Sequence, residues 1–294
     1  MVESAIESAL NQGPEAEVIV VDDGSTDKSF ETASAFEGVT VERTPNRGVS
    51  AARNQGLRLA RGRFIKFLDS DDLLPPGSIT AMFTAAKEQP PKHIVVGAAE
   101  VRAAHSTPQK YGYSKFIEQG PIPGALLLRY TMQSGLPLFP RPALEAAGGF
   151  NEKLSIGEDY ELAARLHVLK YVFVQEPIVA YVLCDHEGER LSRNYGAAGL
   201  RKQIATFSAV RDVLVGASKD ERISVGRAIW CLGREASRME LKPEAEQLFA
   251  MATAIATIQA HVGPLPLRLL YRGLPAYSSE RMFEALKSVS RRFG

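Results

Sequence analysis

Cysteine and long hydrophobic runs are scarce in this chain of 294 residues. The two cysteines, Cys184 and Cys231, belong to no CxxC pair or Cys/His cluster, so the sequence predicts neither a zinc site nor a disulfide framework. No apolar run is long enough to span a bilayer, and no segment resembles a signal peptide. We therefore expect a cytoplasmic protein whose contact with a membrane, if it has one, is at the inner face.

Charge is balanced overall but divided unevenly along the chain. The net formal charge is +1; residues 1–195 carry −5 (20 Lys+Arg, 25 Asp+Glu) and residues 196–294 carry +6 (15 Lys+Arg, 9 Asp+Glu). An acidic first part suits a cation-binding site. A basic second part suits an anionic surface or partner. The C-terminal segment has the pattern of an interfacial amphipathic segment that could contact a membrane, and the alternative, which we favour, is a helix packed on its own domain. We expect no nucleic-acid partner.

Strand and helix patterns alternate through the first part of the chain. Val18-Ile19-Val20-Val21 has the composition of a strand buried on both faces. The alternation predicts an α/β fold with a mostly parallel sheet flanked by helices. The expected strands are 18–21, 39–41, 64–68, 94–101, 171–174 and 178–183, and the expected helices are 2–10, 49–60, one after Pro75-Pro76, and 158–170.

The later chain has a different character. Residues 103–135 are rich in turn formers and predict a loop with short helices. From Gly196 onward strand patterns disappear, which predicts a first domain over 1–195 and a helical C-terminal domain over 196–294. The amphipathic helices expected in the second domain are 197–215, 219–239 and 243–260.

An acidic cluster, Asp69-Ser70-Asp71-Asp72, directly follows the expected strand at 64–68. Carboxylates this close repel one another, so a fold gains nothing from gathering them unless a positive group lies among them. A divalent cation carrying a phosphate fits, because hard cations bind carboxylate and phosphate oxygens. The alternative is a solvated turn with helix-capping aspartates. Asp22 and Asp23 also follow a strand, and open α/β sheets bind ligands at the carboxyl ends of their strands.

Five motifs in a fixed order make this pattern specific. The motifs are 20–27 (Val-Val-Asp-Asp-Gly-Ser-Thr-Asp), 46–56 (Asn-Arg-Gly-Val-Ser-Ala-Ala-Arg-Asn-Gln-Gly), 67–72 (Phe-Leu-Asp-Ser-Asp-Asp), 148–152 (Gly-Gly-Phe-Asn-Glu) and 157–162 (Gly-Glu-Asp-Tyr-Glu-Leu). Tyr181, followed by His186 and Ser192, extends them. Together they resemble the family 2 glycosyltransferases, whose catalytic domain has the GT-A fold, over residues 1–195 and no further.

The resemblance implies roles on the donor side of a site. An aspartate of the first acidic turn holds the nucleotide base in the family, which implies Asp23 or its neighbour Asp22. A carboxylate can accept the imide N–H of uracil, which favours a uridine nucleotide. Arg53 matches an arginine near the nucleotide. Asp69 corresponds to an aspartate facing the ribose or base, and Asp71 to a ligand of Mg²⁺ or Mn²⁺ on the diphosphate.

Each of these assignments has a structural alternative. The two aspartates of the first turn could be helix caps, and Arg53 could be a surface arginine of its helix. We expect Asp72 to cap the helix that follows Pro75 rather than to bind the ion.

On the acceptor side, the resemblance implies Asp159 as the general base, because the family base lies on an acidic pair such as Glu158-Asp159. An acceptor hydroxyl must lose its proton as it attacks the sugar, and a placed base serves this step. The alternative is a helix start whose acids favour the helix dipole. Some family members add a histidine to the metal, which implies His186, although a lone histidine is more often a surface residue.

The function implied is inverting, metal-dependent transfer of a sugar from a nucleotide-sugar donor to a hydroxyl of a saccharide or lipid-linked acceptor. Surface polysaccharide or glycolipid synthesis is the expected setting. The alternative is a catalytically inactive relative that acts as an assembly or membrane-surface module. A nucleotidyltransferase would need a Gly-rich, basic phosphate loop, and no such loop is visible in the sequence.

One departure from the family concerns the sheet. Family members have an apolar strand before the helix that ends in Leu10-Asn11-Gln12, and we expect this chain to lack it. In a parallel sheet such a strand is central, so its loss would strip its neighbours of hydrogen-bond partners. A recorded chain that starts too late, a segment or subunit that fills the gap, and an inactive domain are the three explanations.

Overall fold

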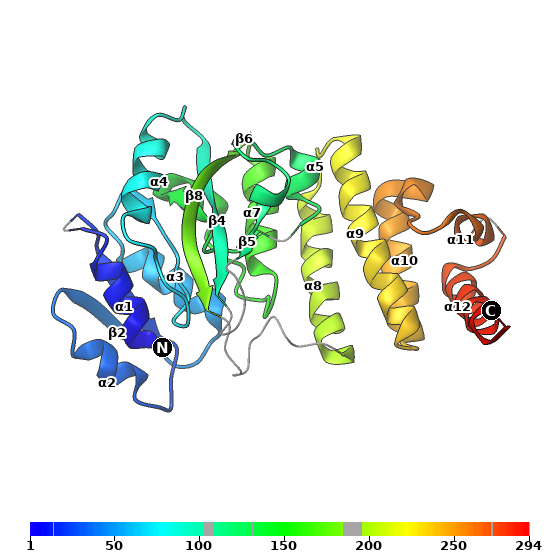
Figure 1. Ribbon diagram of the computed structural model, residues 1–294, viewed down its shortest axis with the longest axis horizontal. Coiled ribbons are helices and arrows are strands. Elements are labelled where there is room, and N and C mark those ends of the chain that lie inside the picture. Colours follow the sequence, from blue (N-terminus) through cyan, green and yellow to red (C-terminus); the bar gives the residue numbers. More distant parts are fainter. Residues whose placement is uncertain (14, 103–108, 131, 185–195, 272, 294) are drawn as a thin grey trace. The chain divides into compact units, whose positions relative to one another are not determined.

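The computed structural model of the chain describes residues 1–13, 15–102, 109–130, 132–184, 196–271 and 273–293 (Figure 1). The chain divides into two compact units. The first combines Met1–Pro123 with Thr131–Gly188, and the second combines Gly124–Tyr130 with Glu189–Gly294. Over the residues described, none of the helices is both long enough and apolar enough to cross a bilayer.

The first unit is an α/β fold whose sheet is in two pieces. In the smaller piece β1 and β2 run parallel. The larger piece has the order β3-β7-β4-β8-β6, with β5 paired to β4. Its elements are α1 (Val2–Leu10), β1 (Val18–Asp22), α2 (Ser29–Ser34), β2 (Val39–Arg43), α3 (Val49–Leu59), β3 (Phe64–Ile65), α4 (Ser78–Lys87), β4 (His93–Arg102), β5 (Gln109–Tyr111), η1 (Tyr113–Lys115), β6 (Gly120–Pro121), β7 (Pro137–Pro140), α6 (Arg141–Ala147), α7 (Glu158–Val168) and β8 (Val172–Cys184).

The expected α/β fold with flanking helices is confirmed, and the sheet is mixed. β4 and β8 are parallel, whereas β7 lies antiparallel between β3 and β4. Two strand predictions were wrong in extent. The strand expected at 64–68 is paired only at Phe64–Ile65, and the two strands expected at 171–174 and 178–183 are one strand, β8, with a register shift opposite Val96–Ala99. β7 was not anticipated.

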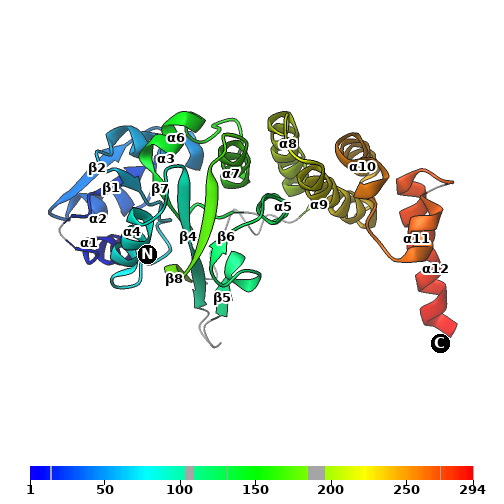
Figure 2. The same ribbon diagram turned by 90° about the horizontal axis from the view of Figure 1, so that it is seen from above.

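Helices cover both faces of β1. Figure 2 shows α1 and α3 on opposite sides of this strand. On the α1 side, Gln12 donates to the carbonyls of Ser8 and Pro75 and accepts the N–H of Ile79, which joins α1 to the start of α4. The predicted full burial of β1 was wrong, however, because Val18 to Val21 are all only half-buried.

The second unit is helical apart from its connections. Its core surrounds Trp230, the single tryptophan of the chain, which is 1% exposed. The Trp230 ring lies 4.6 Å from Phe249, 4.3 Å from His261 and 5.0 Å from Tyr271 between ring centroids. The elements are α5 (Gly124–Leu127), α8 (Ala197–Val213), α9 (Lys219–Arg238), α10 (Lys242–Ala256), η3 (Thr257–Ala260), α11 (Leu265–Leu270) and α12 (Ala276–Phe293).

Candidate active site

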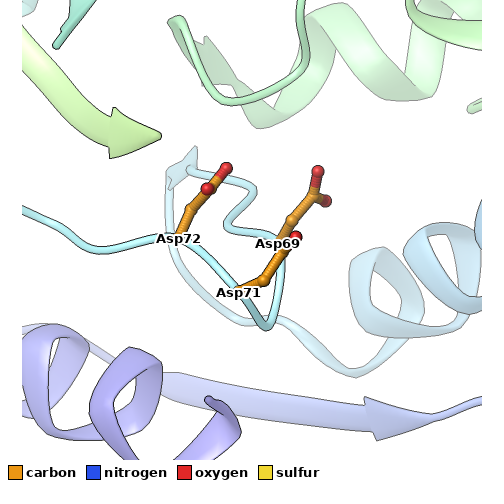
Figure 3. A group of neighbouring side chains, drawn as sticks. All are labelled: Asp69, Asp71 and Asp72. Atoms are coloured by element: carbon orange, nitrogen blue, oxygen red, sulfur yellow. The ribbon is translucent and has the colours of Figure 1, made fainter. Parts of the chain in front are cut away.

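The acidic loop follows β3 and presents three carboxylates to one another (Figure 3). The side-chain oxygens of Asp69, Asp71 and Asp72 lie within 4.8 Å of one another. Asp69 is exposed, Asp71 is half-buried and Asp72 is buried. Phe67 anchors the loop, because its ring meets Phe139 and Phe150 edge-on at 6.0 and 5.0 Å.

Asp72 ties this loop to the end of β8. Its Oδ1 accepts the N–H of Cys184 at 3.1 Å, and the adjacent Leu73 exchanges backbone hydrogen bonds of 3.0 and 2.7 Å with Val182. The prediction that Asp72 caps the following helix was therefore wrong. That helix, α4, begins after Gly77 and has no side-chain cap. The capping interpretation failed because the carboxylate found a backbone donor 112 residues away, which no local pattern reveals.

The acidic loop fits a hard divalent cation. Such a cation takes carboxylate oxygens at about 2.0–2.6 Å, so two ligands of one ion lie no more than about 5 Å apart. The three carboxylates satisfy this spacing. With Asp72 bonded to Cys184, Asp69 and Asp71 are the two residues best placed to hold an ion. His186 lies outside the described residues.

Arg53, from the first half of α3, joins the acidic loop to the start of α7. Its Nη1 donates to Glu158 at 2.6 Å and its Nη2 to Asp69 at 2.8 Å. The guanidinium also lies 5.3 Å above the centroid of the Phe150 ring, and the side chain is 11% exposed. Burial lowers the pKa of Arg53, but the charges of Asp69 and Glu158 outweigh burial and raise it. Arg53 therefore remains a cation between two carboxylates.

The pKa of Asp159 lies well above that of an ordinary aspartate. The residue lies in the first turn of α7 beside Glu158, and its Oδ1 accepts the N–H of Tyr160 at 2.7 Å. Burial and the charge of Glu158 raise the pKa of Asp159 to about 7, against the lowering effect of Arg53. A carboxylate with this pKa can gain and lose a proton near neutral pH.

The two aspartates of the first acidic turn have different partners. Asp23 accepts the N–H groups of Arg47 and Gly48 at 2.9 and 2.7 Å, so it fixes the turn that leads into α3. Asp22 is buried and accepts the N–H of Ser25, and its Oδ2 lies 3.2 Å from Arg43 Nε without hydrogen-bond geometry. An incompletely bonded oxygen at this position is suited to a further polar partner.

Asn54 fixes the loop between α6 and α7 against α3. It donates to the carbonyl of Phe150 and to Glu152, both at 2.9 Å, and accepts the N–H of Phe150 at 2.7 Å. Gly149 has φ of +74°, and a Cβ there would lie 2.5 Å from Asn54 Oδ1, so only glycine fits. Arg47 adds an ion pair to Glu152 at 2.7 Å.

The structure thus brings Arg53, Asp69, Glu158 and Asp159 together, with Asp71 in the adjoining loop. Sequence reasoning did not assign Glu158 as the partner of Arg53. The two residues are 105 positions apart, so no local pattern reveals their pairing. The one local indication was the doubled acid at the helix start.

Comparison with solved structures defines the class of fold. Residues 1–349 of TarS from Staphylococcus aureus match with a TM-score of 0.71 and 17% identity, over 98% of this chain and 88% of that chain. The same TarS fragment solved in complex with UDP matches with a TM-score of 0.53 and 15% identity, over 92% and 87%. The GT-A fold expected from the sequence is confirmed by this likeness.

Sequence comparison gives the family. The model of Glycosyl transferase family 2 matches residues 1–135. The succinoglycan biosynthesis protein ExoU of Rhizobium meliloti is 31% identical over 242 residues, which cover 76% of this chain and 69% of ExoU. The chain belongs to family 2 of the glycosyltransferases.

Proposed function

We propose that the protein transfers a sugar from a UDP-linked donor to a hydroxyl acceptor with inversion at the anomeric carbon. The observation that carries this proposal is the assembly around Arg53, in which a carboxylate with a pKa near 7 lies beside a loop suited to a divalent cation. A solved TarS fragment holds UDP, which supports the choice of donor.

Asp159 acts as the general base in this proposal. The acceptor hydroxyl donates its proton to the Asp159 carboxylate as its oxygen attacks the anomeric carbon from the face opposite the leaving nucleotide. A base with a pKa of about 7 combines a large ionised fraction at neutral pH with useful basicity. Glu158 is bonded to Arg53, so its role is to hold the guanidinium in place.

Donor binding uses the remaining carboxylates. Asp69 and Asp71 would hold Mg²⁺ or Mn²⁺, which, when bound, neutralises charge on the nucleotide diphosphate. Asp22 and Asp23 lie at the end of β1, where one of them would accept the imide N–H of uracil. Arg53 orients the Asp69 carboxylate through their ion pair.

The acceptor class follows from the relatives rather than from the site. ExoU bears the name of a succinoglycan biosynthesis protein. We therefore propose a saccharide or a lipid-linked saccharide as acceptor, in the synthesis of a surface polysaccharide or glycolipid.

The proposal is tested with a panel of nucleotide sugars in the presence of Mn²⁺ or Mg²⁺, with release of the nucleoside diphosphate as the readout. One UDP-sugar should support turnover, and Asp159→Asn should lower kcat by roughly 10²–10⁴-fold. Asp212→Asn, at an exposed aspartate of α8, is the matched control and should leave kcat unchanged. Equal kcat in the two variants would remove Asp159 as the base, and a lack of turnover with every nucleotide sugar would favour the inactive-relative alternative.

We also propose that the basic C-terminal segment, residues 264–294, contacts an anionic membrane surface. The segment holds six Lys+Arg and two Glu. Both acids face cations of the same unit, because Glu280 pairs with Arg234 at 2.6 Å and Glu284 lies 3.8 Å from Arg238. Leu269, Leu274 and Met282 are 53%, 43% and 46% exposed. Exposed apolar side chains in a segment with an excess of basic residues are typical of interfacial segments.

Vesicle co-sedimentation tests this contact. The protein should pellet with vesicles of phosphatidylglycerol and phosphatidylcholine, and not with phosphatidylcholine alone. The double substitution L269S/L274S should weaken pelleting several-fold. Val215→Ser removes an 82% exposed side chain outside the segment and should have no effect. Equal pelleting on both kinds of vesicle would remove the proposal.

A further inference from the structure

Arg43 lies against the first acidic turn, beside the proposed donor site. β1 ends at Asp22 and β2 ends at Arg43, and these two residues are opposite each other in the parallel register of the strands. Both side chains therefore start from the carboxyl ends of their strands, where open α/β sheets bind ligands.

The Arg43 guanidinium is held by this turn at two places. Its Nη2 donates to the carbonyl of Ser25 at 2.8 Å, and its Cζ lies 4.9 Å from the centroid of the Phe30 ring, within the range of a cation–π contact. Ser25 also donates its N–H to Asp22 Oδ1 at 3.2 Å. The turn thus holds guanidinium and carboxylate side by side, while the Arg43 side chain remains 45% exposed.

The hydrogen-bonding capacity of Asp22 and Arg43 is only partly used. Within the part of the chain that the structure describes, the buried Oδ2 of Asp22 accepts no hydrogen bond, because Arg43 Nε, at 3.2 Å, lacks hydrogen-bond geometry. A guanidinium carries several N–H donors, and among the described residues only the Nη2 group of Arg43 makes a hydrogen bond. An acceptor and a set of donors with spare capacity therefore lie next to each other.

Asp23, by contrast, is engaged by its own loop. Its Oδ1 accepts the N–H of Arg47 at 2.9 Å and its Oδ2 accepts the N–H of Gly48 at 2.7 Å. A shift of this side chain toward a ligand would break the bonds that fix the turn into α3. Of the two aspartates proposed for the base, Asp22 is the one with an oxygen that lacks a donor.

The pair of Asp22 and Arg43 matches one edge of a uracil ring. That edge presents a carbonyl oxygen, the N3–H group and a second carbonyl oxygen in order. A carboxylate accepts the N3–H, and a guanidinium beside it donates to a neighbouring carbonyl oxygen, so both hydrogen bonds are charge-assisted. A cytosine ring fixed in the same place by its ribose and diphosphate would present the lone pair of N3 to the carboxylate, which repels it.

We propose that Arg43 is a specificity-determining residue for the donor nucleotide, because together with Asp22 it binds the uracil edge and disfavours cytosine. The ring reaches Asp22 Oδ2 when the guanidinium slides over the face of Phe30 toward solvent, and a donor of Arg43 then bonds the neighbouring uracil carbonyl. This role rests on the proposed UDP-linked donor, and it assigns the choice of base to a residue of β2.

Calorimetric titration of the full chain with UDP and with CDP, each in the presence of Mn²⁺, tests this role. The native protein should bind UDP more tightly than CDP. Arg43→Met should weaken UDP binding roughly 10–100-fold, as expected for the loss of a hydrogen bond from a charged group, and should change the Kd of CDP by less than about threefold. The preference for UDP over CDP should therefore fall by at least about threefold.

Two controls separate recognition of the base from the folding of the turn. Inorganic pyrophosphate with Mn²⁺ lacks the base, so Arg43→Met and the native protein should bind it with the same Kd. Arg61→Met removes the arginine that pairs with Glu17 at 3.0 Å at the opposite end of β1, and it should leave the Kd of UDP unchanged.

The outcomes distinguish this role from the proposed function. Equal Kd values of Arg43→Met and the native protein for UDP would overturn the role of Arg43, and so would an equal loss of UDP, CDP and pyrophosphate binding, which would make Arg43 a structural part of the turn. Both results leave the proposed transferase in place. Failure of the native protein to bind any nucleoside diphosphate with Mn²⁺ would contradict the proposed function, and this role with it.

Discussion

Arg53 is the residue on which the charge balance of the site depends. Its guanidinium bonds Glu158 and Asp69 at once, and its planar fork of donors holds the two carboxylates in a fixed geometry. Without this cation, Asp69, Glu158 and Asp159 would repel one another. Because Arg53 lowers the pKa of Asp159 while Glu158 raises it, the guanidinium also tunes the proposed base.

Removing that charge should therefore move the pH dependence of the reaction. In the native enzyme kcat should rise tenfold per pH unit below about pH 7 and level off above it, because only ionised Asp159 accepts a proton. In Arg53→Met the inflection should lie at higher pH, and kcat/KM should fall roughly 10–100-fold with the loss of two charged hydrogen bonds.

The control for this substitution is Arg58→Met. Arg58 is an exposed arginine of the same helix and binds Gln55. Its loss should leave both the inflection and kcat/KM unchanged. A pH–rate profile of Arg53→Met that coincides with that of the native enzyme would remove Arg53 from the tuning of the base.

At the scale of elements, the site is a set of loops attached to one helix. α3 holds the turn after β1 through Asp23, the acidic loop through Arg53 and the loop before α7 through Asn54. The attachment at Asn54 is buried, and a buried polar group left without its partner costs about 1–3 kcal/mol.

Asn54→Ala should lower the free energy of unfolding by roughly 2–4 kcal/mol, because it leaves the N–H and C=O of Phe150 unpaired. Urea unfolding measures the change. Gln55→Ala, at the next position of α3 with a partner on the surface, should cost less than about 0.5 kcal/mol. Equal losses would show that the loop is held by other contacts.

Substitutions of two neighbouring aspartates of the acidic loop should have different effects on activity. Asp71→Asn removes the charge of a proposed metal ligand. It should raise the Mn²⁺ concentration needed for half-maximal activity at least tenfold. Asp72→Asn keeps an oxygen that can accept the Cys184 N–H, so it should stay within about threefold of the native enzyme. Metal titration of activity distinguishes the two, and a larger effect at Asp72 would make it the main ligand.

The sequence predicted the elements whose residues repeat a local pattern. It predicted less well the features that depend on contacts with distant parts of the chain. α1, β2, α3, α7 and the helices α8, α9 and α10 of the second unit follow from periodicity and lie close to their expected bounds. Two strands were expected at 171–174 and 178–183, whereas in the sheet β4 pairs with both halves of β8 and β6 pairs with its first half. The burial of β1 depends on a neighbour across the sheet, which its own residues do not encode.

The same limit applies to the candidate site. From the motifs we predicted four site residues, Arg53, Asp69, Asp71 and Asp159. Their partners are set by packing between segments about a hundred residues apart. Asp72 was misassigned for this reason.

At the scale of the whole molecule, two half-buried groups make stability depend on pH near neutrality. Burial raises the pKa of Asp159 to about 7 from 3.8 and lowers the pKa of Lys66 to about 7 from 10.5. For Asp159 the unfolded chain ionises first, so stability falls as pH rises from about 4 to 7. For Lys66 the unfolded chain holds the proton longer, so stability is lowest below pH 7 and rises between about 7 and 10.5.

The two substitutions should therefore stabilise the protein in different pH ranges. Asp159→Asn should raise the free energy of unfolding most above pH 7, and Lys66→Met most below pH 7, each by an amount on the order of 1–3 kcal/mol. Chemical unfolding at a series of pH values checks both. If the free energies of unfolding of the variants differ from that of the native protein by amounts that do not vary with pH, the pKa shifts of Asp159 and Lys66 would be contradicted.

The position of Trp230 gives the two units separate optical signals. This single indole lies in the core of the second unit, against His261 and Tyr271, so tryptophan emission reports the unfolding of that unit alone. Circular dichroism, by contrast, sums the helices and strands of both units. Recording the two signals on one denaturant gradient would therefore resolve, without any label, whether the catalytic unit loses its structure before, with or after its helical neighbour.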